Sequence, residues 1–126
     1  MREYLTVAEV YRMQHRLIDL FGGRHGVRDA GLIEAAVFRP QTGYYDSVED
    51  EAAGLMESLG MNPGFLDDSQ RIAFTAADVF LSRNGLYLHV TADEGHSFIA
   101  GSLARQEFRF AKILEWIRAH VKPVDS

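Results

Sequence analysis

Apolar residues recur every three or four positions along most of the chain, which is the spacing of one face of a helix. Near the N-terminus, Thr6 and Glu9 form a capping-box pattern, and the apolar stripe after them stops at Gly22 and Gly23. This pattern predicts a first helix over about 7–20.

Two shorter patterns follow before the middle of the chain. Asp29 is placed to cap a short helix that Pro40 ends, and Ser47 begins a second capping pattern, with an apolar stripe that runs to Gly60. Residues 40–46 between them mix turn residues with two tyrosines. We predict an exposed flap there, either a loop or a small β-hairpin.

The next segment predicts the central helix, over about 69–83. Asp67 and Asp68 precede it as candidate N-caps, and it ends at Asn84 and Gly85. Apolar residues occupy two of its faces. A helix that is apolar on two faces is buried on two sides, so we place it at the centre of the fold.

The last third of the chain adds one extended segment and more helix. Residues 86–90 are short and apolar, and Thr91 begins a further capping box for a helix or a pair of turns to about 103. A last amphipathic helix is predicted near 106–121. The expected fold is therefore all-α, or mainly so, with five or six helices in a single domain over 1–126.

Composition narrows the classes of function. The 126 residues are 47% apolar and 25% charged, with no cysteine and a net charge of -5. This charge disfavours nucleic-acid binding, and the lack of cysteine excludes disulfides, thiolate metal sites and cysteine nucleophiles. No apolar run reaches about 18 residues and no signal-peptide pattern begins the chain, so we expect a cytoplasmic protein without a membrane partner.

The five histidines do not follow a metal-ligand pattern. They never form His-x-x-x-His or His-Glu-x-x-His, so we expect no zinc site. Ordinary surface roles account for His15, His25 and His120. A pairing of His89 with His96, which flank a turn, is the less favoured alternative for these two side chains.

The start of the central helix is where the sequence predicts chemistry. A helix N-terminus presents unpaired N–H groups and a partial positive charge, and it binds phosphate well when an arginine lies in the first turn. Arg71 lies in that turn. The carboxylate of Asp67 is suited to hold Mg²⁺ against phosphate oxygens. The alternative is that Asp67 is only a cap and Arg71 only a solvated side chain.

This segment resembles the death-on-curing (Doc) branch of the Fic/Doc family. That family carries a motif of the form H-P-F-x-D-x-N-K-R at the start of its central helix, and Phe65, Asp67 and Arg71 match it. The run over 73–81 and the segment 27–36 also look like Doc-type sequence, so the resemblance covers nearly the entire chain. It implies a Fic/Doc-type helical bundle around the buried central helix.

The motif departs from the family pattern at its chemical centre. Pro63 stands where the family has its histidine, Ser69 where it has asparagine and Gln70 where it has lysine. If Gly64 is an insertion, Asn62 takes the histidine position instead. The family histidine is the general base, the asparagine and lysine hold phosphates, the acidic residue serves the metal, and the arginine binds phosphate. By resemblance, the catalytic positions that remain are Asp67 and Arg71, the metal residue is Asp67, and the nucleotide-binding residues are Phe65, Asp68, Ser69, Gln70 and Arg71.

The resemblance implies a toxin of a toxin–antitoxin module that uses ATP and Mg²⁺ to transfer a phosphoryl group to a hydroxyl of a translation elongation factor. Its expected partner is a prevent-host-death-type antitoxin. Loss of a general base costs about 10²- to 10⁴-fold in rate, so we expect impaired catalysis. The alternatives are a non-catalytic binding module for an antitoxin, a former substrate or a nucleotide, transfer of a nucleotidyl (AMP) group in the Fic manner, and a helical domain without a family role.

Overall fold

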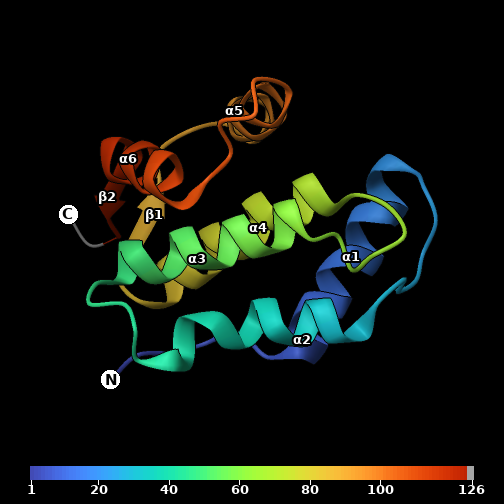
Figure 1. The fold of residues 1–126 in the computed structure, drawn as a ribbon, viewed down its shortest axis with the longest axis horizontal. Helices are drawn as coiled ribbons and strands as arrows, with labels where there is room; N and C mark the ends of the chain where they lie inside the picture. Colours follow the sequence, from blue (N-terminus) through green and yellow to red (C-terminus); the bar gives the residue numbers. More distant parts are fainter. Residues whose placement is uncertain (125–126) are drawn as a thin grey trace.

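The computed structural model describes residues 1–124 and is mainly α-helical, as predicted (Figure 1). Two three-residue strands form a small antiparallel sheet in which Tyr87 pairs with Lys122. The elements are α1 (Val7–Phe21), α2 (Ala30–Phe38), the 3-10 helix η1 (Arg39–Thr42), α3 (Val48–Met61), α4 (Ser69–Arg83), β1 (Leu86–Leu88), α5 (Ala92–Ala104), α6 (Phe110–His120) and β2 (Val121–Pro123).

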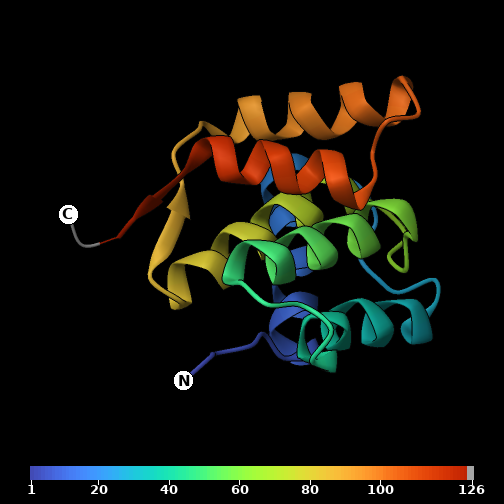
Figure 2. The same cartoon turned by 60° about the vertical axis from the view of Figure 1, so that its left-hand side comes forward.

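The helix α4 lies at the centre of the fold, as its two apolar faces predicted. It packs beside α3, with α5 and α6 on one side of this pair and α2 on the opposite side, while α1 also contacts α4 (Figure 2). Small side chains such as Ala73 and Ala76 let the neighbouring helices come close. The buried residues of α4 are Ile72, Ala73, Phe74, Ala76, Ala77, Phe80 and Leu81.

Four helices begin at the polar residues that the sequence indicated as caps. Thr6 and Thr91 each accept a hydrogen bond from the backbone three residues later, and the glutamate at that position completes a capping box. Asp29 and Ser47 cap α2 and α3 in the same way through one side-chain bond. These starts are specified locally, because each cap satisfies backbone N–H groups that the helix itself leaves unpaired.

The segment 40–46 is the loop, not the small β-hairpin, of the two predicted alternatives, and most of it is exposed. It contains η1 and a turn at Gly43 but no strand, and the small β element forms instead from β1 and β2. The reason is a long-range contact: the Arg39 guanidinium donates to the Tyr45 hydroxyl (2.6 Å) and pairs with Glu57 on α3 (2.9 Å). These bonds hold the segment against α3, although Tyr44 remains 83% exposed.

The last helix also begins later than the sequence pattern suggested. Gln106 adopts a left-handed conformation (φ 58°), and Phe108 is buried before α6 starts at Phe110. The backbone N–H of Phe110 donates to the carboxylate of Glu57 (2.8 Å), so a side chain from α3 fixes this start. Within the described part of the chain, no helix is both long and apolar enough to cross a membrane.

Candidate functional site

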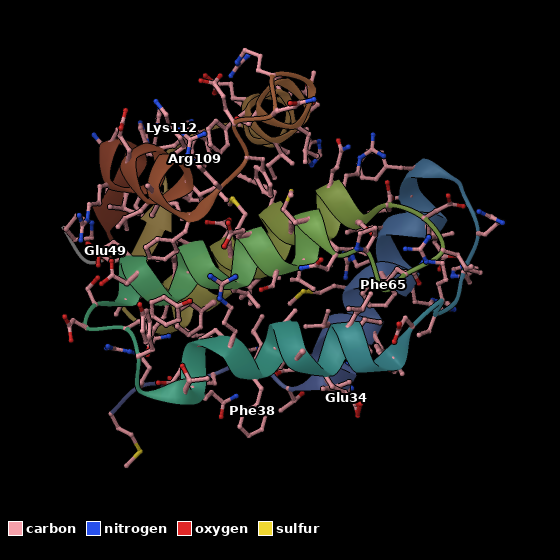
Figure 3. The ribbon with its side chains drawn as sticks, in the orientation of Figure 1. Glu34, Phe38, Glu49, Phe65, Arg109 and Lys112 are labelled. Carbon is pink, nitrogen blue, oxygen red and sulfur yellow. The ribbon has the colours of Figure 1, made fainter. Side chains whose placement is uncertain are left out.

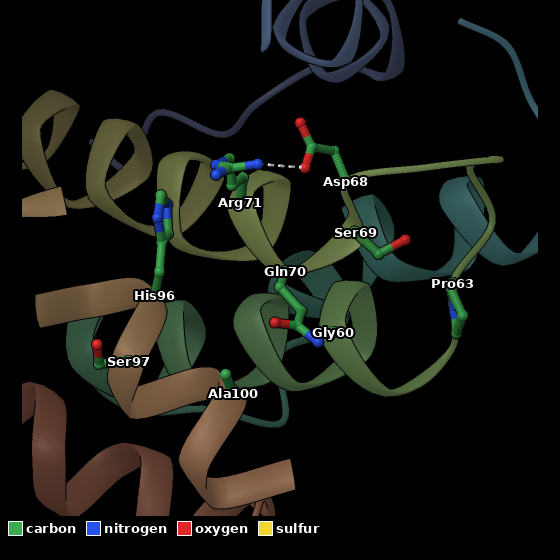
Figure 4. Close-up of a pocket in the computed structure, with 9 residues that line it drawn as sticks. All are labelled: Gly60, Pro63, Asp68, Ser69, Gln70, Arg71, His96, Ser97 and Ala100. Carbon is green, nitrogen blue, oxygen red and sulfur yellow. Dashed lines mark hydrogen bonds and ion pairs between the residues drawn. The ribbon is translucent and has the colours of Figure 1, made fainter. Parts of the chain in front are cut away.

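A cleft of about 510 Å³ opens at the start of α4 (Figure 4). One wall is the first turn of α4, the facing wall is α5, and the end of α3 with the loop after it closes the remaining side. The residues that line the cleft are Gly60, Pro63, Asp68, Ser69, Gln70, Arg71, His96, Ser97 and Ala100. The start of the central helix is therefore accessible to a small ligand.

The two helical walls come close because of one glycine. Gly95 is buried in the first turn of α5, and a Cβ atom at this position would overlap the ring of Phe74 on α4. The capping box of Thr91 fixes where α5 begins, and so fixes which residues of α5 face the cleft. His96, Ser97 and Ala100 are those residues.

The start of α4 is built unlike the capped starts of the other helices. Its N-cap, Asp68, has left-handed backbone angles (φ 71°, ψ 24°) and makes no side-chain cap bond. Its carboxylate turns instead to the guanidinium of Arg71, with Oδ1 to Nη1 at 2.9 Å. The first turn of α4 therefore presents its backbone N–H groups to the cleft without a side-chain cap.

Two polar atoms at this helix start are buried and lack a hydrogen-bond partner within residues 1–124. They are Oδ2 of Asp68 and Nε of Arg71. Unsatisfied buried polar atoms are rare, because each costs about 1–3 kcal/mol. The Arg71 guanidinium is also held from its other side, where it stacks over the ring of Phe21 at 4.2 Å. Both residues line the cleft, and each keeps one polar atom without a hydrogen-bond partner among the described residues.

Asp67, the expected metal ligand, is directed away from the cleft. Its carboxylate accepts hydrogen bonds from the side chain of Arg24 (3.1 Å) and from the Arg24 backbone (2.7 Å). The side-chain bond from Arg24, followed by the backbone bond, lowers the pKa of Asp67 below its ordinary value. The carboxylate that lines the cleft belongs to Asp68, the next residue.

Phe65 lies in the core and does not line the cleft. It is buried, pairs with Val27 through an isolated β-bridge, and meets the ring of Tyr11 edge-on at 5.8 Å beside α1 (Figure 3). This packing fixes the loop in front of α4. The structure thus brings together four of the expected nucleotide-binding residues, Asp68, Ser69, Gln70 and Arg71, but not Phe65.

The two candidate positions for the missing motif histidine lie in different grooves. Pro63 lines the cleft, and its carbonyl accepts a hydrogen bond from Arg28 (2.8 Å). Asn62 lines a separate groove formed with α2 and η1, beside Phe38. Of the two candidate positions, Pro63 is therefore the one that lines the cleft.

An imidazole does reach the cleft, from a residue that the sequence analysis did not select. The side chain of His96 projects from α5 toward Arg71 on α4 (Figure 4). Its ring meets the ring of Phe74 edge-on, with 5.7 Å between the ring centroids. Burial, and next the positive charge of Arg71, lower the pKa of His96, so its neutral form prevails at pH 7. The one signal in the sequence was that His96 and Ala100 share a face of the helix; which face meets α4 depends on tertiary packing.

The chemistry available in the cleft follows from these groups. The start of α4 and Arg71 offer donors to an anion, and Asp68 offers a carboxylate oxygen to a cation. Ser69 and Gln70 add a neutral hydroxyl and an amide. His96 is the only imidazole among the residues that line the cleft.

Comparison with known proteins gives one clear similarity. Over 78 residues the chain is 45% identical to a protein named Toxin Doc from Mycolicibacterium smegmatis. The match covers 58% of this chain and 60% of the relative, so the chain spans less than two thirds of the relative's length. No family model matches the chain. The similarity to Toxin Doc agrees with the resemblance that the motifs indicated: over this stretch the chain is Doc toxin-like.

Proposed function

We propose that this chain is a toxin-family protein of a toxin–antitoxin module, and that its cleft binds the phosphates of a nucleoside triphosphate but transfers them poorly. The observation that carries the binding is the start of α4, where Arg71 Nε and Asp68 Oδ2 are buried without a partner in residues 1–124, at a helix start that has no side-chain cap. Phosphate oxygens would accept hydrogen bonds from Arg71 and from the N–H groups of the first turn.

The residues of the cleft also fit a magnesium ion, with one change from the sequence-based expectation. Asp68 has a carboxylate oxygen without a partner among the described residues, whereas Asp67 is engaged by Arg24. Asp68 would therefore hold the ion, together with phosphate oxygens and water. Bound Mg²⁺ supplies positive charge that offsets the charge of the phosphates.

Impaired transfer follows from what the cleft lacks. Pro63 occupies the position of the motif histidine and has no group that can accept a proton. Gln70 is neutral where the family has a lysine, so it offers hydrogen bonds but no charge to a phosphate. Loss of a general base alone reduces the rate by about 10²- to 10⁴-fold. A protein with this cleft would act mainly by binding its nucleotide or protein partner.

Residual phosphoryl transfer is the second candidate, and the position of His96 favours it. A neutral imidazole in the cleft can take the proton of a target hydroxyl while that oxygen attacks the γ-phosphorus and ADP leaves. Attack at the α-phosphorus, with pyrophosphate leaving, would give AMP transfer instead. From the resemblance we propose a translation elongation factor as the substrate protein. We propose a prevent-host-death-type antitoxin as the partner that inhibits this chain.

The test is a label-transfer assay with ATP labelled at the α or the γ phosphate, Mg²⁺ and purified elongation factor Tu. The proteins compared are the natural chain, the double variant Pro63→His with Ser69→Asn, the variant His96→Ala, and the control His89→Ala at a histidine outside the cleft. Transfer only by the double variant supports impaired catalysis. Transfer by the natural chain that is lost in His96→Ala but kept in His89→Ala supports the second candidate.

A binding measurement separates this proposal from the absence of any nucleotide function. Calorimetric titration of the natural chain with a non-hydrolysable ATP analogue and Mg²⁺ should give a defined 1:1 affinity. No heat of binding, together with silence of all four proteins in the transfer assay, would reject the phosphate site.

A further inference from the structure

Three side chains with metal-binding atoms meet near the end of α1 and the loop that follows it. Figure 1 shows how this loop leaves α1 and turns back to α2. His15 and Asp19 lie one turn apart on α1, and His25 comes from the loop. Nδ1 of His15 is 3.4 Å from one oxygen of Asp19, and Nε2 of His25 is 2.9 Å from the other. No sequence pattern indicated this cluster, because His25 joins it only through the fold of the loop.

We propose that His15, Asp19 and His25 form a binding site for a divalent transition metal, with Zn²⁺ as the preferred ion. Two imidazole nitrogens and one carboxylate oxygen are a donor set that zinc uses, and the remaining position is left to water. This site does not depend on the nucleotide cleft or on the proposed function.

The distances in the cluster match the size of a zinc ion. With bonds of about 2.0–2.1 Å in tetrahedral geometry, neighbouring ligand atoms lie roughly 3.3 Å apart. The nitrogen–oxygen separations of 2.9 and 3.4 Å involve different oxygens of Asp19, of which one would bind the ion, and one ligand atom from each of the three residues lies within 4.8 Å of the other two. A small movement of side chains that are 69%, 58% and 43% exposed would complete the geometry.

The two imidazoles also lie as two ligands of one metal ion would. Their ring centroids are 4.1 Å apart, and each ring has a nitrogen close to the carboxylate of Asp19. A metal ion that binds these three side chains would replace the two histidine–carboxylate contacts with bonds to itself.

Metal binding at this place would fix the loop that leads to the cleft. Arg24, the residue before His25, holds Asp67 through two hydrogen bonds, and its own carbonyl accepts one from Gln14 (3.1 Å). The N–H of Leu66 donates to the carbonyl of Gly26 (3.1 Å). An ion that ties His25 to α1 would therefore also restrain the segment in front of α4.

The direct test is calorimetric titration of the whole protein, free of any affinity tag, with ZnCl₂ in a buffer that does not chelate metals. We expect the natural chain to bind one Zn²⁺. The single variants His15→Ala and His25→Ala should each bind Zn²⁺ at least roughly tenfold more weakly. The control His89→Ala removes a histidine outside the cluster and should bind like the natural chain. Mg²⁺, which prefers oxygen ligands, should not compete.

Two results would overturn the proposal. One is no Zn²⁺ binding by the natural chain, and the other is binding that the His15 and His25 variants retain in full, which would indicate an adventitious ion only. Circular dichroism of both variants checks that they fold, which the exposure of the replaced side chains leads us to expect. As a second readout, Zn²⁺ should raise the melting temperature of the natural chain and of His89→Ala but not of His15→Ala.

Discussion

The starts of α1 and α4 look alike in sequence but differ in structure. At α1, Thr6 is extended (φ -98°, ψ 160°), its hydroxyl accepts the N–H of Glu9 (3.1 Å), and the Glu9 carboxylate accepts the N–H of Thr6 (2.9 Å). At α4, Asp68 is left-handed and gives its carboxylate to Arg71. The first start satisfies its own N–H groups, whereas the second leaves them open to the cleft.

This difference supports the ligand site that we propose at the start of α4. A left-handed residue other than glycine costs about 1–2 kcal/mol, and each unpaired buried polar atom costs about 1–3 kcal/mol. The cost at Asp68 and Arg71 is tolerated because the rest of α4 is buried in the core. Locally unfavourable geometry that the surrounding fold maintains is typical of functional sites.

Among the substitutions that we consider, removal of the Arg71 side chain should have the largest effect on ligand binding at the start of α4. Hydrogen bonds to a charged group contribute about 1.5–3 kcal/mol, so Arg71→Ala should reduce the affinity for a non-hydrolysable ATP analogue by roughly 10- to 150-fold while the protein stays folded. Calorimetric titration measures this change. The exposed Arg12 on α1 provides the control Arg12→Ala, which should bind normally. Unchanged affinity of Arg71→Ala would contradict a phosphate site at the start of α4.

The second prediction concerns the wall that faces this helix start. In Gly95→Ala, the new methyl group would overlap the Phe74 ring, at a cost of about 1–3 kcal/mol that a gain of about 1 kcal/mol in helix propensity only partly offsets. We expect a net loss of up to about 2 kcal/mol in a urea unfolding experiment, and a wider cleft with weaker nucleotide binding.

Gly101, in the same helix, is the matched control for Gly95. A Cβ atom there would meet only the flexible end of the Arg105 side chain. Gly101→Ala should therefore raise the free energy of unfolding by up to about 1 kcal/mol. Equal stability of the two alanine variants would show that α5 is not fixed to α4 by the close contact at Gly95.

Substitutions of the two N-caps should have opposite effects on stability. Thr6→Ala removes the cap of α1 and should cost about 1 kcal/mol. Asp68→Gly relieves about 1 kcal/mol of left-handed strain and loses about 0.5 kcal/mol from the pair with Arg71, so it should be neutral or slightly stabilising. It should also strengthen phosphate binding, because Arg71 loses a competing carboxylate. Urea unfolding measures the effect on stability, and titration with inorganic phosphate measures the effect on binding. If Asp68→Gly lost as much stability as Thr6→Ala, Asp68 would stabilise the start of α4 as Thr6 stabilises the start of α1, and the two helix starts would not differ.

Sequence reasoning predicted the parts of the fold that local interactions decide. The caps at Thr6, Ser47 and Thr91 and the central helix at 69–83 could be predicted, because each depends on residues within a few positions. Which of the two alternatives the segment 40–46 adopts could not, because Arg39 holds it through partners that include another helix.

In the candidate site, too, some features could be predicted from local sequence and others could not. The grouping of Ser69, Gln70 and Arg71 follows from one helical turn and was predictable. Whether Asp67 or Asp68 faces the cleft depends on Arg24, which is distant in sequence, and the entry of His96 depends on how α5 packs against α4. These are tertiary contacts that no local pattern specifies.

The smallest predicted effect concerns the acid sensitivity of the capped start. The hydrogen bond from Arg83, with further bonds from Thr6, lowers the pKa of Glu9 from 4.5 to about 2. Because the folded-state pKa is depressed, the stabilisation by Glu9 is present above pH 4.5 and is lost as the pH falls toward about 2. Since Glu9 is 20% exposed and its partner 35%, we expect this contribution to be only about 0.5–1 kcal/mol at pH 7.

Glu9→Gln should therefore be less stable than the natural chain at neutral pH and should approach it in stability as the pH is lowered from 5 toward 2. Urea unfolding at a series of pH values measures the convergence, and Glu34→Gln, at an exposed glutamate of α2, provides the control (Figure 3). Parallel stability curves for the natural chain and Glu9→Gln would show that the charge of Glu9 does not hold the start of α1. Convergence of the two curves would instead show that the charge of Glu9 stabilises the capped N-terminus of α1, whereas the N-terminus of α4 has no such cap.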